Sequence, residues 1–349
     1  LATRALEPNV FYDPAFALAA APVFGADAGA VLVWSDSARQ HLLGVFPARI
    51  SGAREAHAMR MLVGWTHPYA PLGVPLVDRD EAGAAIRSWL GFVAANDTLP
   101  KRMLLPFVTD DGPFARELAQ ALAERGAPHR RFASHVRALL APADRPADAP
   151  ANYLEASLTA KRQKELARQR RRLGDGGAVE TEILAAPPAV AAGLDDYLAL
   201  EAAGWKDRAG TAAAQNEAVR QFVRQALCGL AARRQVRIAR LSVGVRPAAV
   251  GIVLLSGDTA WFWKIAYDET LSRASPGVQL TLDITRALLA DAEVRRTDSC
   301  ATEGHPMIDH VWRERLALSD HMIVLAGNAP LAFAAETARR RAIAFARAA

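Results

Sequence analysis

The sequence predicts an α/β protein in which a mixed, mostly antiparallel sheet is flanked by helices. Stretches with the two-residue alternation of strands are interrupted by stretches with helical spacing, which favours this fold class. A hairpin-type turn at Gly257–Asp258, followed by a crossover helix, points to a mixed sheet. The chain has 349 residues, and domains usually hold about 100–200, so we expect two domains.

In the first half, residues 30–34 and 41–46 are expected to pair as strands across the polar turn 35–39. Residues 65–79 are rich in proline and aromatic side chains and predict an ordered loop. The last elements of this half are expected to be a helix, a strand and a second helix, at 80–94, 102–108 and 112–125.

The segment 141–151 has the Ala, Pro and Asp composition of a linker, so we place a domain boundary there. We expect a degenerate domain over 1–145, a second domain over 150–330, and a basic C-terminal helix within 331–349. The second domain is expected to alternate helices and strands in this order: helix 152–173, strand 179–184, helices 188–203 and 215–232, strands 236–243, 248–256 and 259–267, helix 276–290, strand 294–299, helix 309–316 and strand 321–325.

Two cysteines, Cys228 and Cys300, lie far apart without a CxxC spacing, which argues against a disulfide framework or a structural zinc site. No apolar run reaches the length of a membrane span, and the first residues lack the pattern of a signal peptide. These features favour the cytoplasm, with peripheral contact at the inner membrane as an open alternative.

The positive charge of the chain is concentrated at 161–172. Seven basic residues stand there against one acid, Glu165, which is a net +6 in a chain whose total is +5. The segment is either a solvated helix face or a contact for anions such as cofactor phosphates, a charged substrate or anionic lipid. Nucleic acid is less favoured, because no aromatic residues are interleaved with the basic ones.

The sequence around Ser275 predicts an anion site at the start of a helix. Ser275 suits the N-cap, Pro276 suits the first helical position, and Gly277 would let a ligand approach the backbone. Unpaired N–H groups and the helix dipole favour an anion there, so Ser275–Gln279, including Val278, are the candidate cofactor-binding residues. The alternative is a well-capped helix without a ligand.

The strand 259–267 carries a lysine among apolar residues. Strict alternation would place Lys264 on one face and four large side chains on the other: Trp261, Trp263, Ile265 and Tyr267. Such a lysine needs a carboxylate, a ligand or solvent. We expect Lys264, Tyr267 and Asp268 to contact substrate, with Asp268 also holding the turn before the helix. A lysine reaching solvent from a half-exposed strand is the alternative.

Two further segments carry candidate chemistry. His305, and after it Glu303 and Asp298, follow a strand end and could act as the general base on an amine or hydroxyl. Their spacing fits no familiar metal-ligand pattern, so no metal is expected. Glu201, Trp205 and Lys206 could form a substrate lid, although Trp205 could equally fill the core beside a solvated turn.

Several motifs together resemble the CelD-type acetyltransferases, a bacterial GNAT family associated with cellulose and exopolysaccharide production and related to the FemAB-type aminoacyltransferases. The resemblance is strong over 150–325, and 9–12 and 64–68 are also similar. The motifs that carry it are Tyr153-Leu154, Lys161-Arg162, Glu165-Leu166, Arg170–Leu173, Glu201, Gly204–Lys206, Gly210-Thr211, Trp263–Glu269 and Ser275–Gly277.

The resemblance implies tandem GNAT domains, an acyl-CoA cofactor and a cytoplasmic enzyme, with the CoA pyrophosphate at Ser275–Gln279. We therefore expect transfer of an acyl group from acetyl-CoA or another acyl-CoA to an amine or hydroxyl of a sugar, a small molecule or a lipid-linked envelope precursor. Two alternatives stay open. One is FemAB-type aminoacyl transfer with the basic helix facing tRNA, and the other is a non-catalytic accessory protein of polysaccharide synthesis.

Overall fold

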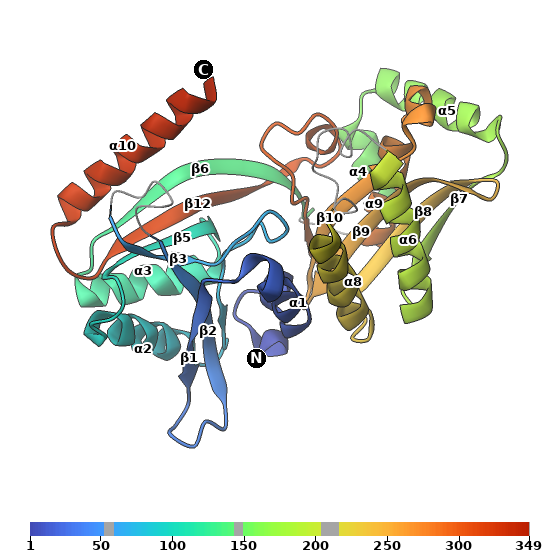
Figure 1. The fold of residues 1–349 in the computed structure, drawn as a ribbon. Coiled ribbons are helices and arrows are strands. Elements are labelled where there is room, and N and C mark those ends of the chain that lie inside the picture. Colours follow the sequence, from blue (N-terminus) through green and yellow to red (C-terminus); the bar gives the residue numbers. More distant parts are fainter. Residues whose placement is uncertain (52–58, 143–148, 204–215, 349) are drawn as a thin grey trace. The chain divides into compact units, whose positions relative to one another are not determined.

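The computed structural model describes residues 1–51, 59–142, 149–203 and 216–348 (Figure 1). Its packing divides the chain into two units. The first comprises Leu1–Tyr12, Phe24–His135 and Ala317–Ala349, and the second comprises Asp13–Val23 and Val136–Leu316. Because these units alternate along the chain and the expected linker is only partly described, the domain limits 1–145, 150–330 and 331–349 stay predictions.

Unit 1 contains a mixed sheet in the order β1-β2-β3-β5-β12-β6, with the short β4 also paired to β2. β3 and β5 are parallel, and the pairs β1–β2, β2–β3 and β5–β12 are antiparallel. The strands are β1 (Ala28–Trp34), β2 (Leu42–Ser51), β3 (Met61–Gly64), β4 (Leu76–Val77), β5 (Arg102–Thr109), β6 (His129–Leu140) and β12 (Glu314–Val324), of which the last two also reach into unit 2.

The helices of unit 1 are η1 (Ala2–Arg4), η2 (Val10–Tyr12), α2 (Ala82–Ala95), α3 (Pro113–Arg125) and α10 (Ala329–Ala348). Helix α3 ends where expected, because Gly126 adopts the left-handed conformation (φ 65°) that closes a helix and disfavours a side chain. The strands β3 and β6 are missing from the sequence prediction, although both are real partners in the sheet.

In unit 2 the strand order is β6-β11-β10-β9-β8-β7, which continues the same sheet from β6. The parallel pair of this unit is β10 and β11, and β7 to β10 form an antiparallel run. The strands that lie wholly in this unit are β7 (Val179–Leu184), β8 (Val236–Val243), β9 (Arg246–Ser256), β10 (Thr259–Tyr267) and β11 (Arg296–Asp298). The predicted hairpin between β9 and β10 is confirmed, and Gly257 has the positive φ of 56° that its turn requires.

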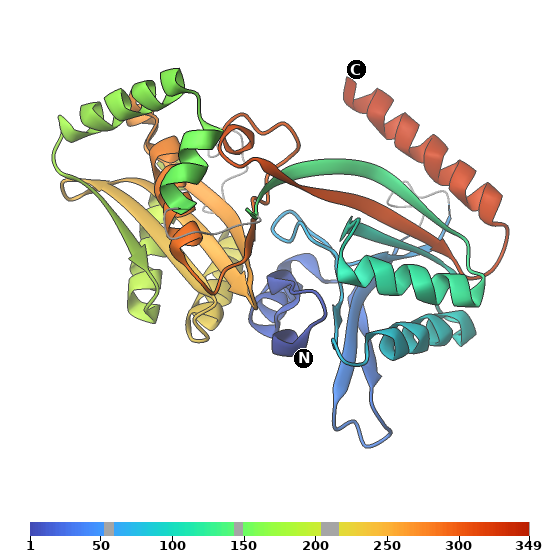
Figure 2. The same cartoon turned by 180° about the vertical axis from the view of Figure 1, so that it is seen from behind.

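Helices cover both faces of this part of the sheet: α6 and α8 lie on one face, and α9 with α4 and α5 on the other (Figures 1 and 2). The helices of unit 2 are α1 (Pro14–Phe24), α4 (Ala149–Ser157), α5 (Ala160–Gly174), α6 (Pro187–Ala203), α8 (Glu217–Ala231), η5 (Glu269–Ala274), α9 (Pro276–Ala290) and η6 (Ile308–His310). A cluster of buried side chains joins α9, α4 and α5 to the sheet, with Leu280, Leu166 and Trp312 among its members.

The strands of the two units follow one plan. In each, an antiparallel run leads into a single parallel pair, and a crossover helix connects the two parallel strands: α2 between β3 and β5, and α9 between β10 and β11. The predicted fold class, a mixed sheet flanked by helices, is confirmed. Among the described helices none is long and apolar enough to span a bilayer.

The single helix expected over 152–173 is wrong, because the chain breaks between α4 and α5. Thr159 has extended backbone angles (φ −62°, ψ 150°), and its side chain accepts a hydrogen bond from the N–H of Arg162 at 3.3 Å. This is an N-cap, which starts a new helix. The short helix expected over 309–316 is also wrong. Only Ile308–His310 is helical there, and β12 begins at Glu314.

The expectation that Trp261, Trp263, Ile265 and Tyr267 share one face of β10 is wrong, because a β-bulge interrupts the strand. Phe262 pairs with Val253 and Lys264 with the next residue, Ile252, so Trp263 is the extra residue on β10. An extra residue reverses the alternation beyond it. Ile265 and Tyr267 therefore pack on the same core cluster as Phe262. Trp263 instead packs its ring on Phe16 of α1, with the centroids 5.6 Å apart.

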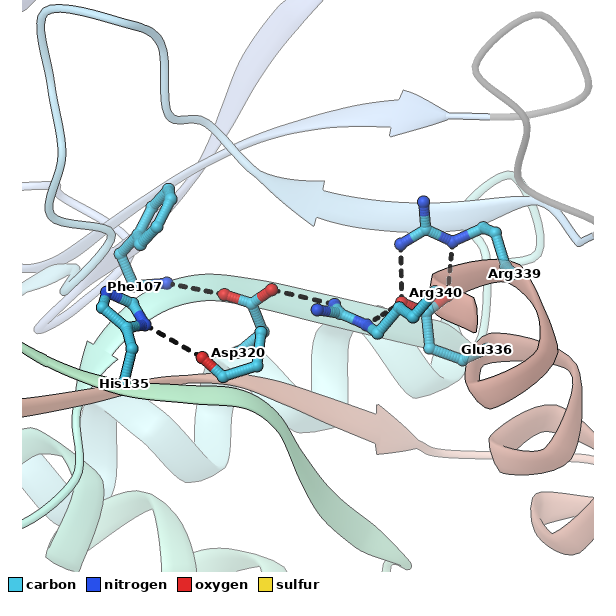
Figure 3. Close-up of polar contacts among 7 residues, drawn as sticks. Phe107, His135, Asp320, Glu336, Arg339 and Arg340 are labelled. Atoms are coloured by element: carbon cyan, nitrogen blue, oxygen red, sulfur yellow. Dashed lines mark hydrogen bonds and ion pairs between the residues drawn. The ribbon is translucent and has the colours of Figure 1, made fainter. Parts of the chain in front are cut away.

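Helix α10 begins at Ala329, slightly before the expected range 331–349, and its first half is anchored on unit 1. Figure 3 shows Arg339 and Arg340 turned toward Glu336, and Arg340 also toward Asp320 of β12. Glu336 is buried at 3% exposure. Burial raises its pKa, but the hydrogen bonds and charges of Arg339 and Arg340 outweigh burial and lower the pKa below its usual value.

Candidate active site

The parallel strands β10 and β11 pair over only three residues and then part. Their register runs from Thr259 and Arg296 to Trp261 and Asp298. β10 continues to Tyr267, and its bulge comes directly after the last pair. In an open α/β sheet, ligands bind beyond the carboxyl ends of parallel strands. The ends of β10 and β11 are therefore the natural place to look for a site in unit 2.

The turn after β10 is built around Asp268. Its carboxylate caps η5 by accepting hydrogen bonds from the N–H (2.9 Å) and the hydroxyl (2.6 Å) of Thr270, and it is also paired with Arg246. Asp268 is 9% exposed. The sequence placed Asp268 in this turn, and the structure shows how the carboxylate holds it. Contact with a substrate stays a prediction.

Helix α9 starts with backbone donors that point out of its end. The first helical bond of α9 runs from the N–H of Gln279 to the carbonyl of Ser275 at 3.1 Å, and Pro276 has no N–H. The N–H groups of Gly277 and Val278 thus have no acceptor within the described part of the chain. Ser275 occupies the N-cap position as expected, but it is left-handed (φ 51°) and its side chain makes no capping bond. These two N–H groups can hold an anion.

Two residues of the predicted cofactor segment serve the fold instead. The amide of Gln279 is 2% exposed and donates to the backbone carbonyl of Leu166 in α5 at 2.8 Å, which fixes α5 against α9. The Cα of Gly277 faces the ring of Tyr267, and a Cβ there would lie 3.1 Å from a ring carbon. A side chain at this position would have to displace the Tyr267 ring by a few tenths of an ångström, so the glycine favours this close packing as well as any ligand.

A pocket of about 420 Å³ opens between α5, the first turn of α9 and the segment 306–311. It combines a cation, hydroxyl groups and apolar walls, and its lining includes Thr159, Arg162, Val278, Met307 and His310. We call it the α9 pocket. The sequence grouped Arg162 with the basic patch but did not connect it with Val278, since they lie 116 residues apart.

The strand β11 ends in a buried ion pair. Asp298 receives a hydrogen bond from Arg137 of β6, and both side chains are 3% exposed. The second carboxylate oxygen accepts the N–H of Cys300 at 2.9 Å. With both oxygens engaged inside the protein, these contacts favour a structural role for Asp298, and its predicted role in proton transfer stays a prediction. Arg137 was missed by the sequence analysis because nothing local indicates its partner.

Cys300 follows this pair in a left-handed conformation (φ 52°). Burial raises the pKa of its thiol, as does the charge of Asp298, while Arg137 and Lys264 act in the opposite direction. The net shift is well above the usual value. A neutral thiol is a poor nucleophile, so Cys300 is not poised for covalent catalysis.

His305 and Glu303 lie in the segment that follows. His305 is partly buried, and its Nδ1 accepts the N–H of Met307 at 3.3 Å, which leaves Nε2 for another contact. Glu303 is exposed. The lining of the α9 pocket begins at Pro306, directly after His305. The structure thus brings His305 close to the pocket, and its role as general base stays a prediction.

The remaining predicted substrate residues are spread over the end of β10 and the end of α6. The Lys264 Nζ lies 5.8 Å from the centroid of the Trp263 ring, and its charge acts on the Cys300 thiol. Tyr267 lines a second pocket, of about 370 Å³, with Arg246 and Asp268. Trp205 and Lys206 lie outside the described residues.

Glu201 is 5% exposed and accepts a hydrogen bond from the hydroxyl of Tyr197 at 2.7 Å, within α6. It does not line either pocket described above. No group of three or more His, Cys, Asp and Glu side chains in the described ranges could hold a metal ion.

Comparison with known proteins identifies the plan of unit 2. Residues 160–305 match the family model described as an acetyltransferase (GNAT) domain. These residues have a GNAT-like fold. The matched range contains α5, α9 and the end of β11, so it includes most of the candidate site. No curated protein sequence matches the chain significantly.

Solved structures extend the likeness to nearly the whole chain at the level of the fold. FemX has a TM-score of 0.61 at 9% identity, with 95% of each chain covered. A conserved protein of unknown function from Bacteroides thetaiotaomicron VPI-5482 has a TM-score of 0.56 at 12% identity, covering 93% of this chain and 94% of that one. The C-terminal domain of a putative lysylphosphatidylglycerol synthetase from Agrobacterium fabrum has a TM-score of 0.50 at 13% identity, with 88% of each covered.

Proposed function

We propose that this protein transfers an acyl group from acyl-CoA to an amine or hydroxyl of a sugar or of a cell-envelope or exopolysaccharide precursor. The start of α9 is the observation that carries the proposal. Within a GNAT-fold domain, two free N–H groups of a 15-residue helix stand beside a pocket that also holds Arg162. This is the chemistry that binds phosphate.

The residues present fit the pyrophosphate of CoA. The N–H groups of Gly277 and Val278 would hold one part of it, and Arg162 would supply the countercharge. When bound, acyl-CoA supplies an activated thioester. His305, or Glu303, would then take the proton from the acceptor, and Lys264 would balance negative charge near the ends of β10 and β11. Positioning donor and acceptor side by side needs no covalent intermediate on the protein.

Arg162 is the residue that tests this proposal most directly. It is exposed at the N-terminal end of α5 and has no acidic partner within the described part of the chain, so reversing its charge should leave the fold intact. We expect Arg162→Glu to weaken acetyl-CoA binding by at least tenfold, measured by calorimetry. Arg171→Glu, an equally exposed charge reversal on the same helix, is the matched control and should bind acetyl-CoA like the parent. No heat of binding in the parent, or equal losses in both variants, would remove the proposal.

The variant Gly277→Glu is a less clean test of the phosphate site than Arg162→Glu. The new side chain would meet the ring of Tyr267 as well as any phosphate. A loss of acetyl-CoA binding in that variant would therefore not separate a missing ligand contact from a displaced Tyr267.

FemAB-type aminoacyl transfer is the second candidate. It is favoured by the fold likeness to FemX and by the basic α5, which could face tRNA. The same calorimetry decides between them when aminoacyl-tRNA replaces acetyl-CoA as the titrant. Binding of the charged tRNA without binding of acetyl-CoA would favour the second candidate.

A further inference from the structure

One face of α5 carries a continuous row of exposed cations. From its first to its fourth member the row advances by three or four residues at each step, and its last member lies four residues after the third, so all five share one face. We call this row the α5 stripe, and it consists of Lys161, Lys164, Arg168, Arg171 and Arg172, all exposed. The opposite face of the helix is buried through Leu166, Gln169 and Leu173. At 1.5 Å per residue the stripe extends over roughly 16 Å.

Four of the five cations form no ion pair with an acid in the described part of the chain. Arg168 is bonded to Glu165 at 2.9 and 2.8 Å, but no carboxylate within the described ranges lies in ion-pair distance of the other four. Arg170, outside the stripe, shows the contrast, because it pairs with Asp283 of α9 at 2.9 Å. Like charges three and four residues apart destabilise a helix. The single acid of this helix, Glu165, offsets only part of the repulsion through Arg168 and Arg172, and an external anion would relieve the rest.

The C-terminal helix α10 is also basic, but two of its arginines are already paired within the protein. Arg339 and Arg340 are bonded to Glu336, and Arg340 also to Asp320, so these two side chains anchor α10 on its own unit (Figure 3). The α5 stripe is therefore the stronger candidate for a surface that meets an anionic partner.

We propose that the α5 stripe docks on an anionic phospholipid surface. A single convex helix with a straight row of cations matches a plane of headgroup charges. The helix 160–174 contains no aromatic residue that could stack on a base, which argues against single-stranded nucleic acid. The exposed face of α5 has no large apolar side chain to insert, so attraction is electrostatic and reversible. This proposal stands independently of which group the enzyme transfers.

Vesicle co-sedimentation tests the docking. The full chain is mixed at low salt with vesicles of equal parts phosphatidylcholine and phosphatidylglycerol, or of phosphatidylcholine alone. We expect sedimentation only with the anionic vesicles and release at high salt. In the variant Lys164→Glu/Arg171→Glu, the loss of two cations alone should lower partitioning by roughly thirtyfold, at about 1 kcal/mol for each basic residue.

The matched control is Arg60→Glu/Arg125→Glu, which makes the same change of net charge at exposed positions of unit 1. It should sediment like the parent. Failure of the parent to bind anionic vesicles, or an equal loss in the control, overturns the proposal. Tighter binding to bulk tRNA than to vesicles at the same salt, lost in the α5 variant, would assign the stripe to nucleic acid instead. Acetyl-CoA binding is measured in parallel, and because neither substituted residue lines the α9 pocket it should not change.

Discussion

Removing Arg137 should expose how much the end of β11 depends on a buried charge pair. In Arg137→Met the apolar stem is kept, but the carboxylate of Asp298 is left without its cation at 3% exposure. Breaking a buried ion pair by removing one partner typically costs about 3–5 kcal/mol. We expect the free energy of unfolding of unit 2 to fall by that amount at neutral pH, measured by urea unfolding with tryptophan fluorescence and circular dichroism.

The double variant Arg137→Met/Asp298→Asn is the informative control. Asparagine keeps an oxygen that can accept the N–H of Cys300, while the uncompensated charge is gone. We expect the double variant to recover most of the stability lost in Arg137→Met, because replacing both members of a buried pair is often near neutral. Equal losses in the single and double variants would show that Arg137 acts through its packing and would refute the reasoning.

Three further predictions concern stability. His321 is 1% exposed, and burial together with the charges of His129 and Arg131 lowers its pKa to about 4. The free energy of unfolding should therefore be complete above about pH 6.5, the pKa of histidine in the unfolded chain, and should fall by on the order of 3 kcal/mol as the pH drops to about 4. In urea titrations at several pH values, His321→Gln should flatten that profile. Thr159→Ala removes the N-cap of α5 and should lower the free energy of unfolding by about 1 kcal/mol, measured from the same urea unfolding curves. Gly193→Val should lower the free energy of unfolding by about 1–3 kcal/mol and lower the melting temperature. Even a Cβ at this position would lie 2.9 Å from the stiff side chain of Ile238.

Local signals in the sequence were enough for most elements. The helix predicted at 276–290 coincides with α9, since Pro276 fixes its first residue and the apolar period persists to Ala290. The helix break before α5 could also have been found, because threonine is a residue type favoured at N-caps and Thr159 stands directly before the basic helical run. A strong run of helix-forming residues on both sides concealed it.

The candidate site was predicted less well, because its decisive contacts are long-range. The amide of Gln279 reaches the carbonyl of Leu166, 113 positions earlier, and Arg137 reaches Asp298, 161 positions later. No local pattern encodes either partner. The bulge at Trp263 had a similar effect, since one inserted residue moved Ile265 and Tyr267 to the other face of β10.

The two proposals meet in α5. One face of this helix lines the α9 pocket through Arg162 and is tied to α9 by the bond from Gln279 to the carbonyl of Leu166, while the other face presents the α5 stripe. A membrane that binds the stripe and a CoA phosphate that binds at Arg162 therefore act on a single rigid element. By linkage, if vesicles change the affinity for acetyl-CoA by some factor, acetyl-CoA must change the affinity for vesicles by the same factor. Equality of these two factors is required whatever their size. A factor of one would mean that docking on a membrane only localises the enzyme, and a larger factor that it also sets donor binding.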